Sequence, residues 1–92
     1  MKLLDKILDD YYARRFLDPI KREVEVKYNL DVEIVKKKSF YLFRVKRPKF
    51  NDVCFREIYS LSVKRAFVAA IRYEAEKSFI LEEVKYYLKY NR

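Results

Sequence analysis

The residues that could support chemistry are few and lie apart in the chain. Glu25 and Lys27 have the Glu-x-Lys spacing of some metal-dependent nucleases, and Asp18 precedes them. Carboxylates beside a lysine can hold Mg²⁺ next to a phosphate. Asp31 and Glu33 would also share one face of a strand. Matches of three residues are common by chance, so this spacing is only a weak indication of a nuclease.

Two residue types on which many active sites depend are missing. The 92 residues include no His and no Gly. Without His there is no Ser-His or Cys-His nucleophilic pair, and the commonest zinc ligand is absent. Without Gly there is no glycine-rich phosphate loop and no nucleophile elbow. We therefore expect a binding protein and not an enzyme, with no catalytic residue, no metal site and no cofactor.

The length of the chain and its single cysteine, Cys54, bear on its organisation and location. A chain of 92 residues suits one domain over residues 1–92. One cysteine cannot form an internal disulfide, which favours a reducing cytoplasm, and its apolar neighbours favour a buried thiol. The longest apolar runs, 40–43 and 67–71, are far too short to span a bilayer. We expect no membrane partner.

Helical periodicity marks the beginning of the chain. Residues 2–17 are predicted to form an amphipathic helix, because apolar residues recur there at spacings of three and four. These residues are Leu4, Ile7, Leu8, Tyr11 and Tyr12. Asp18 and Pro19 should end this helix and begin a second, short one. The second helix should run to Tyr28, with Asn29 as its left-handed stop.

Three strands are predicted in the middle of the chain. They cover residues 31–37, 40–47 and 53–59, with turns at 38–39 and 48–52. Links this short favour an antiparallel meander. Apolar residues also alternate over residues 24–34, so one long strand remains the alternative to the second helix.

The last third of the chain is predicted to be helical. Ser60 or Ser62 should cap a helix, and Ser78 either breaks it or lies within a helix that continues to Tyr90. One face of this segment would carry Val63, Phe67, Ala70, Ile71, Leu81, Val84 and Leu88. The predicted fold class is therefore α+β: N-terminal helices, a three-stranded antiparallel β-meander, and a C-terminal helix or helices packed on one sheet face. The other sheet face would stay open.

The positive charge is concentrated in one predicted hairpin and the turn after it. The formal net charge is +8. Residues 1–35 carry −1 and residues 51–92 carry +2, whereas residues 36–50 carry +7 and no acid. A solvated surface normally mixes signs because like charges repel. Such a cluster can follow the phosphates of a nucleic acid, although lysines at a sheet edge also serve to prevent edge-to-edge pairing.

Aromatic residues alternate with these cations along residues 40–47. One strand face carries Phe40, Leu42, Arg44 and Lys46, and the other carries Tyr41, Phe43, Val45 and Arg47. If the second face is open, Tyr41 or Phe43 would stack on unpaired bases. The alternative is that both faces pack, one on the helices and one in a dimer. The candidate nucleic-acid contacts are Lys36, Lys37, Lys38, Tyr41, Phe43, Arg44, Lys46, Arg47 and Lys49.

Tyrosines gather in the last predicted helix. Tyr73, Tyr86, Tyr87 and Tyr90 lie there beside lysines. Because tyrosine is enriched at protein interfaces, these residues are a candidate protein interface. The alternative is an amphipathic helix whose tyrosines partly cover the core.

The leading hypothesis is a nucleic-acid-binding protein, with the type of nucleic acid open. The alternative is a protein-binding module or inhibitor of a larger host complex, whose basic patch meets an acidic protein surface. A homodimer joined by the last helix is a third possibility. In composition the chain resembles phage or virus accessory proteins, being small, without Gly, and dense in Lys, Tyr and Phe.

Overall fold

Helices and strands follow each other in the order that the sequence predicted. The computed structural model describes residues 2–48 and 55–90. Its elements are α1 (Lys2–Tyr28), β1 (Asp31–Lys36), β2 (Phe40–Lys46), β3 (Arg56–Ser62), the 3₁₀ turn η1 (Val63–Arg65), α2 (Ala66–Ile71) and α3 (Tyr73–Tyr90). The predicted α+β fold with an antiparallel meander is confirmed. Most of the predicted turn at 48–52, Cys54 and the start of the predicted third strand lie outside the described residues.

α1 is one helix where the sequence predicted two. Pro19 lies inside it, so the prediction of a helix end at this proline is wrong. An internal proline costs a helix roughly 3 kcal/mol. Buried residues continue on both sides of Pro19, namely Phe16, Leu17, Ile20 and Val24. Burying each such side chain contributes about 1.5–3 kcal/mol, so packing of the continuous helix outweighs the lost hydrogen bond.

Asn29 turns the chain from α1 into the sheet. Its φ of 52° is the left-handed conformation predicted for this residue, which Asn tolerates better than most side chains do. Residues 24–28 are helical, which excludes the alternative of one long strand. At the first hairpin turn the Lys37 N–H donates to the Phe40 carbonyl at 2.8 Å. β2 is the central strand, between β1 and β3.

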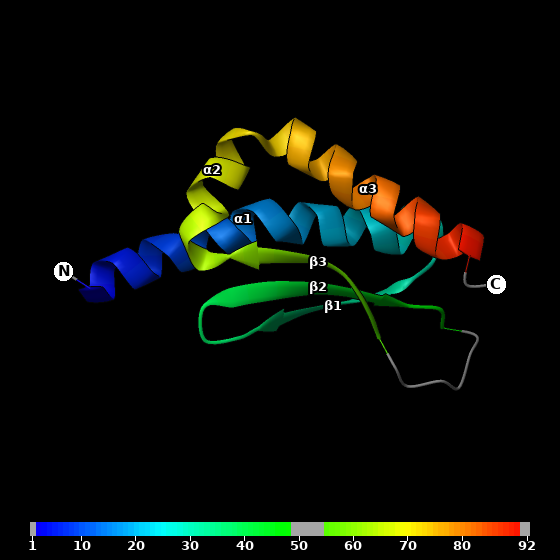
Figure 1. Cartoon of the computed structure of the whole chain (residues 1–92), viewed down its shortest axis with the longest axis horizontal. Coiled ribbons are helices and arrows are strands. Elements are labelled where there is room, and N and C mark those ends of the chain that lie inside the picture. The colour runs from blue at the N-terminus through cyan, green and yellow to red at the C-terminus, as the bar shows by residue number, and fades with distance from the viewer. Residues whose placement is uncertain (1, 49–54, 91–92) are drawn as a thin grey trace.

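The helices cover one face of the sheet, as predicted. α1 and α3 run in the same direction along it, and no described helix lies on the opposite face (Figure 1). The core that they enclose includes Ala13, Phe16, Leu17, Ile20 and Val24 of α1, Val32, Tyr41, Phe43, Val45, Tyr59 and Leu61 of the sheet, and Ile80 and Val84 of α3. The opposite sheet face is therefore the open one.

α2 packs on α1 through a different face from the predicted one. Ala66 and Ala69 are buried, whereas Phe67 and Ile71 are exposed. The small alanines let α2 approach α1 closely, and the larger side chains are left at the surface.

Two predictions about helix ends have different outcomes. Ser62 caps η1, since its hydroxyl accepts from the Lys64 N–H at 3.2 Å. The break between α2 and α3 falls at Arg72, so Ser78 lies within α3. Neither α1 nor any other helix of the described ranges combines the length and apolarity that crossing a membrane requires.

Candidate nucleic-acid interface

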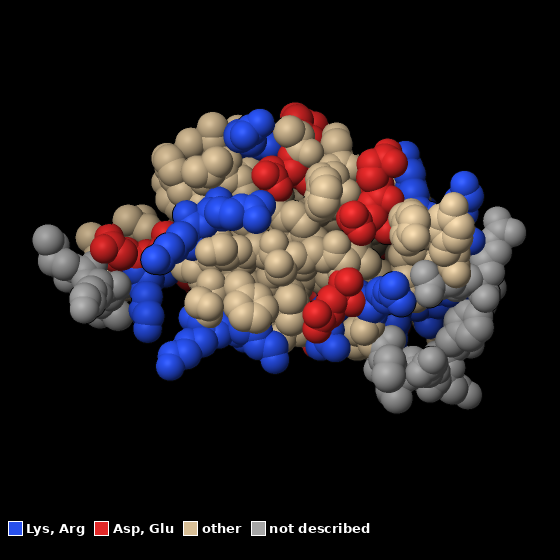
Figure 2. Space-filling model, in the orientation of Figure 1, with Lys and Arg blue, Asp and Glu red and all other residues tan. Residues whose placement is uncertain are grey.

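Two basic segments that are distant in sequence meet at one end of the sheet. The Val63 N–H donates to the Ser39 carbonyl at 3.0 Å, which holds η1 against the β1–β2 turn. We call the cations of these two segments the basic end: Lys36, Lys37, Lys38, Lys64 and Arg65. On the face seen in Figure 2, Lys and Arg side chains gather at the end of the molecule that holds this turn and η1.

Most of the basic end has no acidic partner. Among residues 2–48 and 55–90, no carboxylate forms an ion pair with Lys37, Lys38 or Lys64. All three are exposed. Lys36 and Arg65 do have partners, although more than half of each side chain remains exposed. Exposed cations without counter-charges are the groups that can neutralise phosphates and release counterions.

Asp10 is the acid that borders this end. Its carboxylate lies 3.1 Å from Lys36 Nζ and 3.3 Å from Arg14 Nε, and it accepts from the Tyr41 hydroxyl. Burial alone would raise the pKa of Asp10, but the hydrogen bonds and charges of Lys36 and Arg14 outweigh it and lower that pKa. Asp10 therefore stays ionised and holds the end of β1 on α1.

A small cleft beside Lys36 extends the positive surface along α1. Its volume is about 150 Å³. It is lined by Arg14, Leu17, Asp18, Lys21, Ile34, Lys36 and Tyr41. Three cations line this space, but two of them, Arg14 and Lys36, pair with Asp10. Lys21 is the cation of the cleft with which no described carboxylate forms an ion pair.

At the other end of β2, the cations of the predicted hairpin already have partners. Arg44 lies on the open face between Glu33 and Glu57, at 3.5 Å and 3.9 Å. Lys46 Nζ lies 5.1 Å from the centre of the Phe55 ring. Arg44 thus pairs with carboxylates, whereas Lys46 is held beside an aromatic ring.

Arg47 is anchored to the C-terminal helix. Its Nη2 donates to the Leu88 carbonyl at 3.0 Å, and its guanidinium lies 5.9 Å from the Tyr87 ring centre. Cations are favoured near the C-terminus of a helix, where carbonyls lack intrahelical partners. Lys49, the remaining predicted contact, lies outside the described residues.

Tyr41 and Phe43 offer no exposed ring to a nucleic acid. Both are buried, with 1% and 0% of their surface exposed, although Tyr41 also lines the small cleft beside Lys36. Their strand face is the one that α1 and α3 cover, so the condition for base stacking is not met and the prediction that either ring stacks on bases is wrong. The physical reason is that these rings supply more apolar burial than the alternate positions, Phe40 and Leu42, could.

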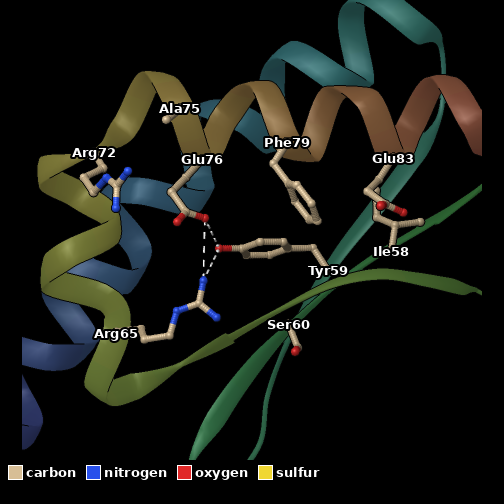
Figure 3. A pocket seen from close by; sticks show the side chains of 9 residues that line it. All are labelled: Ile58, Tyr59, Ser60, Arg65, Arg72, Ala75, Glu76, Phe79 and Glu83. Atoms are coloured by element: carbon tan, nitrogen blue, oxygen red, sulfur yellow. Dashed lines mark hydrogen bonds and ion pairs between the residues drawn. The ribbon is translucent and has the colours of Figure 1, made fainter.

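A groove lies next to Arg65, between β3 and the helices α2 and α3. Its volume is about 520 Å³. Tyr59 points across it and donates its hydroxyl to Glu76 at 2.8 Å, while Arg65 reaches the same carboxylate at 3.6 Å (Figure 3). Burial, followed by the hydrogen bond and charge of Glu76, raises the pKa of Tyr59 well above its ordinary value. Phe79 and Arg72 also line the groove.

The four candidate interface tyrosines divide into two pairs. Tyr73 and Tyr87 are partly buried against the core. Tyr86 and Tyr90 are exposed, and their ring centres are 4.5 Å apart. Only the second pair is placed to meet a partner, and Lys85 and Lys89 lie beside it.

The residues of the Glu-x-Lys spacing are all on α1. Asp18, Glu25 and Lys27 lie along this helix. Glu33, one of the two strand acids, pairs with Arg44. Over the described ranges, no three acidic or cysteine side chains are close enough to hold a metal ion.

Lys64 and Arg65 are the members of the basic end that the sequence prediction missed. The signal was present in the predicted topology. In a three-stranded meander, the third strand ends beside the turn that joins the first two, so residues that follow it lie next to that turn. The basic pair that follows the third strand is therefore expected to lie next to the lysines of the turn.

Comparisons of this chain with protein families, curated proteins and solved structures found no match.

Proposed function

We propose that this protein binds a nucleic acid through its basic end. The observation that carries the proposal is that the Val63–Ser39 hydrogen bond brings two basic segments together. Three of the resulting cations lack an acidic partner among the described residues.

The proposed mode of binding is contact with the phosphate backbone. Lysines recognise phosphates as point charges and carry no base-specific information. The open sheet face supports no larger interface, because Asp31, Glu33 and Glu57 outnumber Arg44 and Lys46 on it. Binding would therefore be weakly selective for nucleic-acid sequence. The proposed location is a reducing cytoplasm.

The test is fluorescence anisotropy with labelled single- and double-stranded oligonucleotides over a series of salt concentrations. Three phosphate contacts would give a slope of log K against log salt of about −2.7 for duplex DNA. Affinity would then fall on the order of 40-fold between 50 and 200 mM salt. No binding at low salt by the folded protein would refute the proposal.

A second candidate function is that of a protein-binding module or inhibitor of a larger host complex. The exposed pair Tyr86 and Tyr90, whose rings are in contact, favours it, since Lys85 and Lys89 beside the pair could meet an acidic protein surface. If oligonucleotides do not bind, affinity capture from a host lysate with wild-type protein and a Tyr86→Ala/Tyr90→Ala variant would test this function. A partner retained equally by both would contradict it.

A further inference from the structure

The first turns of α1 carry an apolar stripe that the fold does not bury. The exposed fractions are 58% for Leu4, 56% for Ile7, 44% for Leu8 and 52% for Tyr11. We call these four residues the α1 stripe. The sequence analysis grouped these four residues with Tyr12 as the apolar set of an amphipathic helix, but of the five only Tyr12 packs against the core. An apolar side chain alone on a surface is ordinary, whereas four on one face of a helix indicate a contact surface.

The α1 stripe points away from the core of its own molecule. At about 100° per residue, its members cluster on the side of the helix opposite to Ala13, Leu17 and Ile20. The beginning of α1 also projects beyond the sheet and α2 (Figure 1). No rearrangement within the described fold could therefore bury the stripe without detaching α1.

Apolar surface continues from the stripe onto α2. Tyr12 and Phe67 form an edge-to-face ring pair with centres 5.1 Å apart. Leu8 and these two rings line a groove of about 490 Å³, together with Asp5, Asp9 and Lys64. Phe67, Val68 and Ile71 are each about half exposed or more.

The exposed apolar area suits one protein partner of ordinary size. Five large side chains, the four of the α1 stripe and Phe67 on α2, border this groove or lie next to it and are each about half exposed. Half of such a side chain leaves on the order of 100 Å² in contact with water. Together they supply about 500 Å² of the ~800 Å² per partner that a standard stable interface buries.

We infer that this surface joins two copies of the chain, with their α1 helices antiparallel. The charges beside the stripe favour a second copy over another protein, because they complement each other by position along the helix. Asp5 lies beside its beginning, and no described residue forms an ion pair with it. Arg15 lies at its end, where it donates to the Tyr11 hydroxyl at 2.9 Å and pairs with no carboxylate of the described residues.

The antiparallel direction follows from this charge order. In an antiparallel pair, Arg15 of one copy lies near Asp5 of the other on each side of the twofold axis, and the stripes face each other. A parallel pair would place like charges together.

The interface is independent of nucleic-acid binding. Because Lys64 lines the adjoining groove, the dimer would carry one basic end on each side of its interface.

Analytical ultracentrifugation over a concentration series tests this inference. The wild type is expected to sediment with twice the 11.4 kDa mass of the chain. Ile7→Glu/Leu8→Glu should sediment as a monomer with an unchanged circular-dichroism spectrum, because both side chains are already exposed. Val26→Glu is the matched control: Val26 is 85% exposed on the same helix but outside the stripe, so this variant should remain a dimer.

A charge exchange tests the identity of the partner. Asp5→Arg and Arg15→Asp should each weaken the dimer at least about 5-fold, and the double variant should recover it, because the pairs reform with opposite signs. A monomeric wild type at the highest concentration would overturn the inference, and the surface would then belong to a different protein. A dimer that survives Ile7→Glu/Leu8→Glu would overturn it as well.

Discussion

The two ends of the basic segment at residues 36–50 carry similar formal charge but differ in how much of it is available. At the β1–β2 turn, Lys37 and Lys38 extend into solvent beside Lys64, and no described carboxylate pairs with them. At the opposite end, Arg44 is held between two glutamates and Arg47 by a helix carbonyl. A run of cations in a sequence therefore measures charge, whereas binding depends on the charge that the fold leaves without a partner.

The largest expected effect is on binding at the turn. Lys37→Glu/Lys38→Glu/Lys64→Glu should weaken oligonucleotide binding at least about 100-fold, because each reversal replaces a phosphate contact with a repulsion. Anisotropy at low salt measures the change. The melting temperature serves as the control, since these three side chains form no ion pair with a described carboxylate. Affinity close to that of the wild type would place the binding site elsewhere.

The corresponding change at the opposite end should affect stability instead. Arg44→Met leaves Glu33 and Glu57 facing the same site without their cation, and we expect a loss of about 1–2 kcal/mol in the free energy of unfolding. Urea denaturation measures it, and Glu33→Gln/Glu57→Gln in the same chain should restore part of the loss. Oligonucleotide affinity should change less than about twofold. A large loss of affinity with unchanged stability would mean that Arg44 contacts the nucleic acid and does not stabilise the fold.

Beside the basic end, Tyr59 should make stability depend on alkaline pH. Tyrosines of the unfolded chain ionise above about pH 10, whereas burial and Glu76 keep the pKa of folded Tyr59 above its ordinary value. The stabilisation from this difference is complete below pH 10 and is lost as the pH rises further.

Tyr59→Phe tests this pH dependence. The variant should lose about 1 kcal/mol at neutral pH with the hydrogen bond to Glu76, and its stability should decline less steeply than that of the wild type above pH 10. Urea denaturation over a pH series measures both quantities. Tyr86→Phe is the control, because Tyr86 is exposed. If stability declines equally above pH 10 in the wild type and in Tyr59→Phe, Tyr59 is not the cause of the pH dependence.

The smallest expected effect concerns Lys64, one of the two residues of the basic end that the sequence prediction missed. Lys64→Gln should weaken binding a few-fold and reduce the steepness of the salt dependence by about 0.9, the contribution of one phosphate contact to duplex DNA. The same anisotropy series provides this slope. An unchanged slope would mean that η1 supports the turn without contacting the phosphates.

The fold was predictable where local signals agreed with burial. Alternating residues and short turns predicted the ends of the three strands to within about three residues. Asn29 has the predicted left-handed conformation. Pro19 misled because a local signal was outweighed by an apolar face that continues on both sides of it.

The site was harder to predict, because it depends on which side of β2 is covered. Alternation divided Tyr41 and Phe43 from Arg44 and Lys46 correctly. It could not decide which set faces the helices, since both sets include large apolar side chains. The partners of Arg44 and Arg47 come from β1, β3 and α3, so the ion pairs of Arg44 and the anchoring of Arg47 appear only in the folded chain.

The central claim is that available charge, and not the number of cations, determines binding. The most direct test compares two variants of equal net charge, Lys37→Gln/Lys38→Gln and Lys46→Gln/Arg47→Gln, by anisotropy with one oligonucleotide at one salt concentration. Circular dichroism confirms that both are folded. The first variant should lose on the order of 10-fold or more in affinity, and the second should stay within about twofold of the wild type. Equal losses in the two variants would contradict it.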